Sequence, residues 1–366
     1  MNVVAMIMLV FSVLGAIDRI IGNRFGLGKE FENGFLMFGK SALSMIGMIV
    51  ISPWIAQALT PVFDGFWKWF HMDPAVIPAS LFANDMGGAP LSVEVAVDPQ
   101  MGKFCALVVS SMMGVTISFT VPYALGVVDQ KLHKWLLLGL LCGVVTVPVG
   151  CLVGGVMLGI PFGSLVYNLL PIILFSGIIG IGLLKFPDAC VKIFSVFAVL
   201  IKAVITVGLV IGIIHFLTDY KLIENMATLE EGAAICLNAS VVMSGAFPLV
   251  YVLSKVLAKP LRAIGKKLQV NEISAVGFLS SLASSITTFG VMNKMDEKGA
   301  MLNSAFAVSA AFVFAGHLAF TMAWDIAYLP AMIVGKLVAG VLALVVAYFL
   351  HKRLNKAVPE NAQPAS

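Results

Sequence analysis

Apolar stretches of about 20 residues recur along almost the whole chain, and they limit the possible fold more than any motif does. Such stretches are longer than a buried strand or a core helix requires, and they are long enough to cross a bilayer as helices. With 60% hydrophobic and 11% charged residues, the chain has too few polar side chains to cover a water-soluble surface. We therefore expect an all-α polytopic membrane protein.

Nine stretches are long enough to span a bilayer. Their ranges are 3–21, 35–59, 104–128, 135–158, 165–184, 193–216, 233–256, 301–323 and 328–350. Two further segments, 74–96 and 271–292, are apolar but interrupted by Asp, Asn, Ser, Thr, Gly or Pro. Irregular backbone is tolerated at membrane depth only where protein or a water-filled cavity satisfies its polar groups. We expect both interrupted segments to be re-entrant hairpins.

Basic residues orient this arrangement, because cytoplasmic loops of membrane proteins carry an excess of Lys and Arg. The strongest basic loop, between the seventh span and the second hairpin, contains Lys255, Lys259, Arg262, Lys266 and Lys267. The carboxyl-terminal tail is also basic. Alternating sides backwards from this loop places the acidic residues Glu224, Glu230 and Glu231 outside. It also places the amino terminus outside and the carboxyl terminus in the cytoplasm.

A weak internal repeat agrees with this orientation. Residues 32–34 match 230–232, and residues 45–47 match 243–245, both at an offset of 198 (232 minus 34), and at 199 Asp85 falls opposite Ser284. Five crossings separate equivalent points, so the halves have opposite orientations, as in the inverted repeats of secondary transporters. The predicted organisation is a first repeat (1–160), a connector (161–192), a second repeat (193–351) and a cytoplasmic tail (352–366).

The first interrupted segment contains a carboxylate, Asp85, that needs a physical reason. A lone Asp at the bilayer centre costs about 2.5 to 3.5 kcal/mol on insertion scales. An organic cation, a buried Lys or a proton would offset this cost. The following Gly87 and Gly88 let the backbone leave helical geometry and let a ligand approach, and Pro90 cannot donate to a continuing helix. The alternative is that Asp85 caps a helix at a wet loop end.

The second interrupted segment is rich in hydroxyl groups, among them Ser284, Ser285 and Thr288. Hydroxyls and freed carbonyls of a broken helix can bind an amine, an alcohol or an ion. Hydrogen bonding between helices is the alternative use.

Other polar side chains in or beside the later spans complete the candidate substrate-binding set. They are Asn238, Asn303, Ser309, His317 and Asp325, together with Asn84 next to Asp85. An intramembrane His is either functional or only a satisfied hydrogen-bonding residue. Lys336 lies some eight residues into the last span, where it can snorkel or neutralise Asp85 or Asp325.

Several function classes are not expected from this sequence. It has no Walker A motif, no HExxH and no intact nucleophile elbow, which argues against an ATP-driven pump or a membrane protease. The five cysteines lie in apolar stretches without CxxC spacing, which favours packing roles. We expect no metal, no cofactor and no nucleic acid partner.

Four motifs resemble those of a known bacterial family. They are ANDMGG at 83–88, SSMMG at 110–114, AFAVSAAF at 305–312 and IVGKL at 333–337. In this order, from about residue 15 to 350, the chain resembles the ethanolamine-utilisation permease family. The resemblance implies a transporter in the bacterial cytoplasmic (inner) membrane that supplies ethanolamine to the ethanolamine ammonia-lyase pathway. In the family an acidic residue often precedes the histidine, where this chain has Gly316, so any role of that acid would pass to Asp85 or Asp325.

The residues and the resemblance agree on the kind of ligand. Ethanolamine at neutral pH carries an ammonium group, which needs an acid, and a hydroxyl, which needs polar neighbours. We expect Asp85 to bind the ammonium, and Asn84, Ser284, Ser285 and His317 to line the site. Two rivals are a channel-like facilitator for ethanolamine or ammonium and a membrane-embedded enzyme acting on a lipid headgroup. Coupling to H⁺ or Na⁺ and a homo-oligomeric state stay open.

Overall fold

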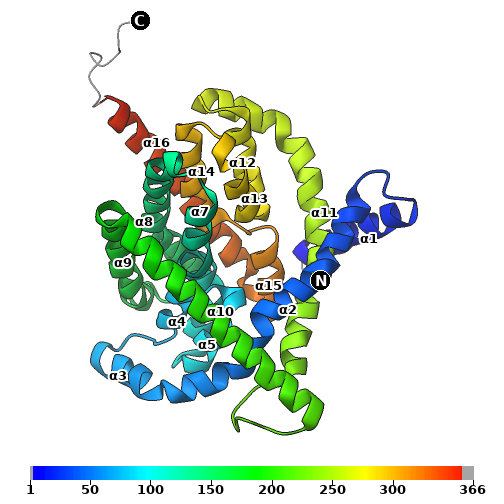
Figure 1. Cartoon of the computed structure of the whole chain (residues 1–366), viewed down its shortest axis with the longest axis vertical. Helices are drawn as coiled ribbons and strands as arrows, with labels where there is room; N and C mark the ends of the chain where they lie inside the picture. Colours follow the sequence, from blue (N-terminus) through cyan, green and yellow to red (C-terminus); the bar gives the residue numbers. More distant parts are fainter. Residues whose placement is uncertain (1–2, 357–366) are drawn as a thin grey trace, which may run out of the picture.

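The computed structural model describes residues 3–356, and these form a bundle of helices without strands (Figure 1). The first half contains α1 (Val3–Ile20), α2 (Leu27–Ala58), α3 (Thr60–Phe70), α4 (Val76–Leu81), α5 (Gly88–Val95), α6 (Pro99–Phe104), α7 (Val121–Val127) and α8 (His133–Met157). A connecting helix, α9 (Phe162–Lys185), follows. The second half contains α10 (Pro187–Thr218), α11 (Leu229–Leu268), α12 (Glu272–Ala283), α13 (Ser285–Gly290), α14 (Glu297–Ala310), α15 (Gly316–Trp324) and α16 (Leu329–Lys356).

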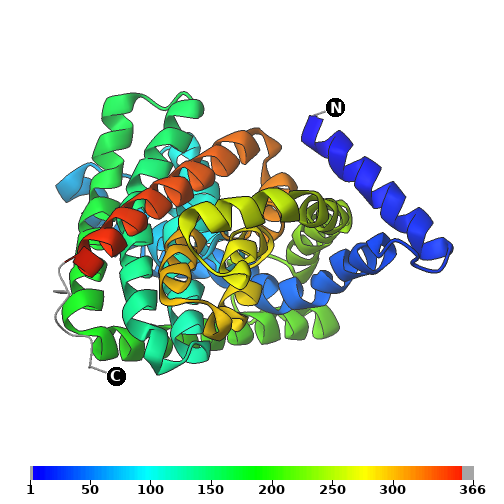
Figure 2. The same cartoon turned by 90° about the horizontal axis from the view of Figure 1, so that it is seen from above.

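Eight helical stretches in residues 3–356 are long and apolar enough to cross a membrane, which confirms the all-α polytopic class. They are Val3–Ile20, Leu27–Ala58, Pro99–Val127, Gln130–Met157, Phe162–Gly182, Ser195–Thr218, Leu229–Val256 and Ile326–Leu354. The helix α1 lies at the edge of the bundle (Figure 2), and its buried residues are only Met8, Gly15 and Asp18. Such a helix leaves most of its apolar surface to lipid.

Two features differ from the sequence prediction. The stretch 301–323, expected as one span, is divided: α14 ends at Ala310 and α15 begins at Gly316. The basic segment 255–267, expected as a loop, continues α11 as helix up to Leu268. Of the predicted cytoplasmic tail, residues 357–366 lie outside the described residues. The number of crossings and the repeat boundaries stay predictions.

The first interrupted segment folds as a helical hairpin. Helices α4 and α5 run side by side, and the Ser92 hydroxyl donates a hydrogen bond of 3.2 Å to the Ala75 carbonyl. Asp73 closes the base, because its carboxylate accepts the backbone N–H groups of Val97 (3.1 Å) and Asp98 (2.8 Å). The segment therefore enters and leaves the bundle at the same end, as a re-entrant hairpin does.

The second interrupted segment forms a similar hairpin from α12 and α13. The chain bends at Ser284, which has extended backbone angles. Beyond the bend, the Thr288 hydroxyl donates a hydrogen bond of 3.1 Å to the Gly277 carbonyl. At the base, the Asp296 carboxylate accepts the N–H of Asn271 at 2.8 Å. In Figure 1 this hairpin lies in the upper half of the molecule and the first hairpin in the lower half. Insertion of either hairpin from one side of a membrane stays a prediction.

The contacts of the two halves are related by the same offset as the sequence repeat. The acids at the hairpin bases, Asp98 and Asp296, are 198 residues apart (296 minus 98). Where α2 crosses α11, Gly34 faces Ser244, and the equivalent Gly232 faces Ile46. Each contact is thus the image of the other, which supports a pseudo-two-fold relation between the halves. Their opposite orientation with respect to a membrane stays a prediction.

Two glycines make the closest of these helix crossings. A Cβ atom on Gly47 of α2 would overlap the Ile205 carbonyl oxygen of α10. A Cβ on the equivalent Gly245 of α11 would overlap the Met8 carbonyl oxygen of α1. Close approach of backbones through small residues is the usual way in which membrane helices pack.

We expect Gly47→Ala to destabilise the protein by about 1–3 kcal/mol, because the added methyl group overfills a backbone contact that cannot yield. The matched control is Gly39→Ala in the same helix, where a Cβ meets nothing within 4 Å. Thermal unfolding in detergent measures both. Equal melting temperatures for the two variants would contradict this packing.

Candidate functional site

The tip of the first hairpin presents a polar pair, Asn84 and Asp85, between α4 and α5. Gly87 turns the chain here with φ +108°, a conformation that favours glycine. The Asp85 carboxylate is half-buried, and among the side chains that the structure describes none donates a hydrogen bond to it. Asn84 is fully buried, and neither its amide nitrogen nor its amide oxygen has a partner in the structure. Buried polar groups are rarely left unpaired, so this tip is suited to a polar ligand.

The tip of the first hairpin packs against a distorted helical stretch. Between α6 and α7 the chain forms wide π-helical turns at Cys105–Gly114 and Thr116–Thr120. The Ser118 hydroxyl accepts the backbone N–H of Ala83, just before the tip, at 3.0 Å. π-Helical turns occur frequently at functional sites.

The break between α14 and α15 is held by the tip of the second hairpin. The backbone N–H groups of Phe312 and Phe314 donate to the carbonyls of Ser281 and Leu282, both at 3.0 Å. Phe312 has φ +62°, which is unusual for a residue with a side chain. The break thus lies against the hydroxyl-rich hairpin instead of continuing the helix.

Directly after this break, His317 is buried against Phe312, with ring centroids 5.2 Å apart. Its Nδ1 atom has no hydrogen-bond partner in the structure. The helix that it begins, α15, contacts the Asn84–Met86 tip of the first hairpin. His317 is therefore a buried polar group with an unpaired atom, on the helix that contacts the tip bearing Asp85.

A fully buried cation, Lys336 of α16, connects these residues. Its ammonium group donates a hydrogen bond to the Ser111 carbonyl in the first π-helical stretch. Its charge interacts with the carboxylate of Asp85 and with the imidazole of His317. No ion pair within 4.0 Å joins Lys336 to Asp85. The region where the first hairpin's tip contacts α15 and the π-helical stretch thus has one acid and one buried ammonium that influence each other without an ion pair.

Other predicted site residues lie in different settings. Ser285 and Ser309 are buried and their hydroxyls have no partner, while Ser284 is half-buried. The Thr288 hydroxyl donates to the Gly277 carbonyl within the second hairpin. The Asn303 amide group donates to the Ser274 carbonyl of α12 and to the Gly299 carbonyl of its own helix, α14. Asn238 is exposed on α11. Gly88 is buried in the first hairpin, where a Cβ would overlap the Phe82 carbonyl oxygen.

Asp325 has a cationic partner of its own, Lys103. Its carboxylate accepts from the Lys103 ammonium at 2.8 Å, which links the end of α15 to α6. Burial alone would raise the pKa of Asp325. The hydrogen bond and the charge of Lys103, together with the hydrogen bond from the Ala327 N–H, outweigh burial and hold this pKa below its usual value. Lys336 therefore acts on Asp85, while Asp325 has a separate cationic partner.

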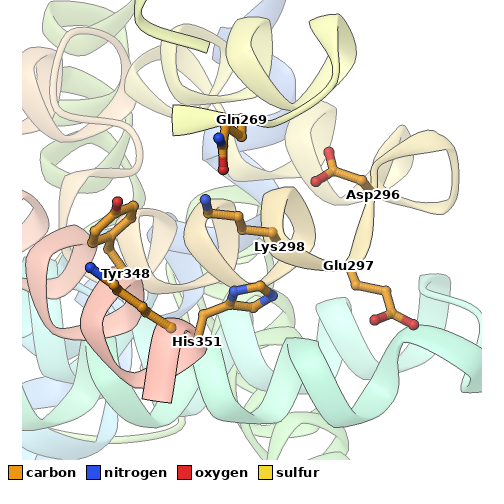
Figure 3. A pocket seen from close by; sticks show the side chains of 7 residues that line it. Gln269, Asp296, Glu297, Lys298, Tyr348 and His351 are labelled. Atoms are coloured by element: carbon orange, nitrogen blue, oxygen red, sulfur yellow. The ribbon is translucent and has the colours of Figure 1, made fainter. Parts of the chain in front are cut away.

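Two open cavities lie at the two hairpin bases. The cavity at the first base has a volume of about 890 Å³ and is lined by four exposed carboxylates, those of Asp64, Glu94, Glu224 and Glu231. The cavity at the second base, about 650 Å³, has a mixed lining in which the Lys298 ammonium lies 4.9 Å from the centroid of the Tyr348 ring (Figure 3). The acidic cavity is the one suited to attract a cation.

One buried residue beside His317 is absent from the sequence prediction. Thr321 follows His317 by four residues on α15, is fully buried, and its hydroxyl has no partner in the structure. Side chains spaced by four share a helix face, so the spacing from His317 was an available signal.

The fold defines a polytopic α-helical membrane protein in which the tip of one hairpin contacts α15 and the π-helical stretch. The chain belongs to the family described as "Ethanolamine utilisation protein, EutH", which matches residues 1–350. No solved structure matches the chain.

Curated relatives cover nearly the whole chain. A protein of Listeria monocytogenes serotype 1/2a named "Probable ethanolamine permease EutH" is 42% identical over 100% of this chain and 98% of its own length. A protein of the same name from Salmonella typhimurium is 34% identical over 95% of both chains. The "Uncharacterized protein YxeR" of Bacillus subtilis is 37% identical over 95% of this chain and 94% of its own length.

We expect the Lys103–Asp325 pair to contribute about 0.2–1 kcal/mol at neutral pH, because both side chains are partly exposed to solvent. A folded-state pKa that is lowered gives stability above the unfolded pKa and loses it as the pH falls through the folded pKa. A double-mutant cycle with Lys103→Gln and Asp325→Asn, read by thermal unfolding, should therefore show coupling at pH 7 that vanishes in strong acid. Coupling that is unchanged by acid would argue against an ion pair.

Proposed function

We propose that this chain is a permease of the bacterial inner membrane that takes up protonated ethanolamine. One observation carries the proposal: the Asp85 carboxylate lies at a hairpin tip where no described side chain donates to it, next to Asn84, whose buried amide has no partner. The names of the relatives from Listeria and Salmonella support the choice of ethanolamine.

The chemistry of the ligand matches these open positions. An ammonium group supplies three donors and a positive charge, which the Asp85 carboxylate needs. A hydroxyl group both donates and accepts, so it can pair with the amide of Asn84 and with Nδ1 of His317. Ser285 and Thr321 supply further hydroxyls whose partners are missing. In this proposal none of these groups takes part in bond chemistry, so the protein is a transporter and not a lipid headgroup enzyme.

Asp85→Asn should abolish saturable ethanolamine uptake in proteoliposomes, because the amide keeps the shape of the side chain but removes the counter-charge. The purified variant should remain folded, because removing the buried carboxylate relieves its desolvation cost and the amine of Lys336 can become neutral by releasing its proton. It should also lose the rise in melting temperature that ethanolamine gives the parent protein by mass action.

Glu32→Gln is the matched control, because it removes one carboxylate from an exposed ion pair with Arg19. It should keep both uptake and ligand stabilisation. Should Asp85→Asn be stabilised by ethanolamine as strongly as the parent, Asp85 is not the ammonium site. A loss of folding without loss of affinity would indicate a capping role instead.

We further propose that the amino terminus is outside and the carboxyl terminus is cytoplasmic. The basic segment 255–267 and the acidic loop before α11 support this orientation. It also places the acidic cavity on the outer side, where substrate arrives.

Single cysteines introduced as Asn2→Cys and Ser366→Cys, in a background without the five native cysteines, test the orientation. A membrane-impermeant maleimide should label the first in intact cells and the second only after permeabilisation. Labelling of both cysteines from the same side of the membrane would contradict this orientation and the odd number of crossings.

A further inference from the structure

The position of Lys336 makes it an unusual residue for a membrane protein. Its side chain is fully buried on α16, and its ammonium has one hydrogen-bond acceptor, the Ser111 carbonyl, where three could be used. A buried ammonium is costly unless an opposite charge compensates it. In the described part of the chain, Asp85 is the one carboxylate whose charge acts on it.

Lys336 is anchored to the first π-helical stretch through the Ser111 carbonyl, and the Asn84–Met86 tip contacts both this stretch and α15. The titratable groups coupled electrostatically to Lys336 are Asp85 of the tip, His317 of α15 and Cys151 of α8. When His317 and Cys151 are neutral, Asp85 carries the only negative charge among these three groups. In the empty site the charges of Asp85 and Lys336 therefore cancel.

The proposed substrate disturbs this balance. If the ethanolamine cation binds to Asp85 while Lys336 keeps its proton, two positive charges share one carboxylate in a buried region. The excess charge costs free energy, because the surrounding helices offer it no second acid. Release of the Lys336 proton restores neutrality.

We infer that Lys336 is the resident cation of the Asp85 site, and that each ethanolamine cation taken up is exchanged for one proton. This inference rests on the proposed function. On binding from outside, the substrate ammonium replaces the charge of Lys336, whose amine releases its proton to the outer solution. After the substrate leaves on the inner side, the amine takes a proton from the cytoplasm, and the site returns with its charges balanced.

The cycle moves no net charge: one substrate cation enters and one proton leaves. Uptake then responds to the substrate gradient and the pH difference but not to the membrane potential. Transport of the neutral amine would have the same net stoichiometry as this exchange. Variants at Lys336 are therefore needed to distinguish the two mechanisms.

Lys336→Met removes the resident cation, and Lys336→Arg makes it permanent, because a guanidinium cannot be deprotonated in a protein. Proteoliposomes at pH 6, where little ethanolamine is neutral, would carry an internal pH dye and a potassium gradient with valinomycin. For the parent protein we expect saturable uptake, alkalinisation of the lumen and no dependence on the imposed potential.

For Lys336→Met we expect uptake that follows an inside-negative potential without alkalinisation. For Lys336→Arg we expect ethanolamine affinity reduced on the order of tenfold or more, because the second positive charge stays in the site. Lys202→Met is the matched control, since Lys202 is an exposed lysine on a spanning helix, α10. It should behave like the parent.

The outcomes separate this inference from the proposed function. Saturable uptake by the parent that follows the membrane potential would overturn the exchange and leave the permease standing. Absence of saturable uptake by the parent would overturn the permease itself. If Lys336→Met stays electroneutral, the protein carries the neutral amine and Lys336 is not exchanged. If Lys336→Met does not fold, the ethanolamine affinity of Lys336→Arg decides, and an affinity equal to that of the parent would overturn the exchange.

Discussion

Backbone that leaves the helix inside an apolar layer must find its hydrogen-bond partners within the protein, and this constraint organises the structure. The chain meets it by pairing each irregular stretch with another. The N–H groups of Phe312 and Phe314 at the α14–α15 break are satisfied by carbonyls of the second hairpin, and the first hairpin uses Ser118 in the same way. Hairpins and broken helices therefore stabilise one another, and neither would persist alone at this depth.

The same constraint explains why the candidate site lies where these stretches meet. Once the backbone is satisfied, a few side chains remain buried without partners, among them Asn84, Ser285 and His317. Two glycine crossings, at Gly47 and Gly245, hold the outer helices close around this region. A rigid frame with a small number of unpaired polar groups at its centre is suited to selective binding of a small polar cation.

The sequence predicts the two hairpins because Asp, Ser, Gly and Pro interrupt otherwise apolar segments, and it predicts the helical class from hydropathy alone. The break at 311–315 could not be predicted, since Ala311 to Ala315 contain no Gly or Pro and the break is imposed by tertiary hydrogen bonds to Ser281 and Leu282. The separate partners of Asp325 and Asp85 were also beyond sequence reasoning, because Lys103 is 222 residues from Asp325 along the chain.

The charges at the site leave little freedom for a mechanism. At the position before His317, where the resemblance to the ethanolamine-utilisation permeases suggests an acid, this chain has Gly316. Among the described residues, Asp85 is the one carboxylate whose charge acts on Lys336, and under the proposed function it also binds the incoming cation. A site with two acids could hold both positive charges at once. A site with one acid is neutral with either cation but not with both, so the substrate and the protonated Lys336 compete for it. One of the two positive charges must therefore leave the site. A lysine is fixed to its helix and can give up only its proton, which makes proton release the consistent response to substrate binding.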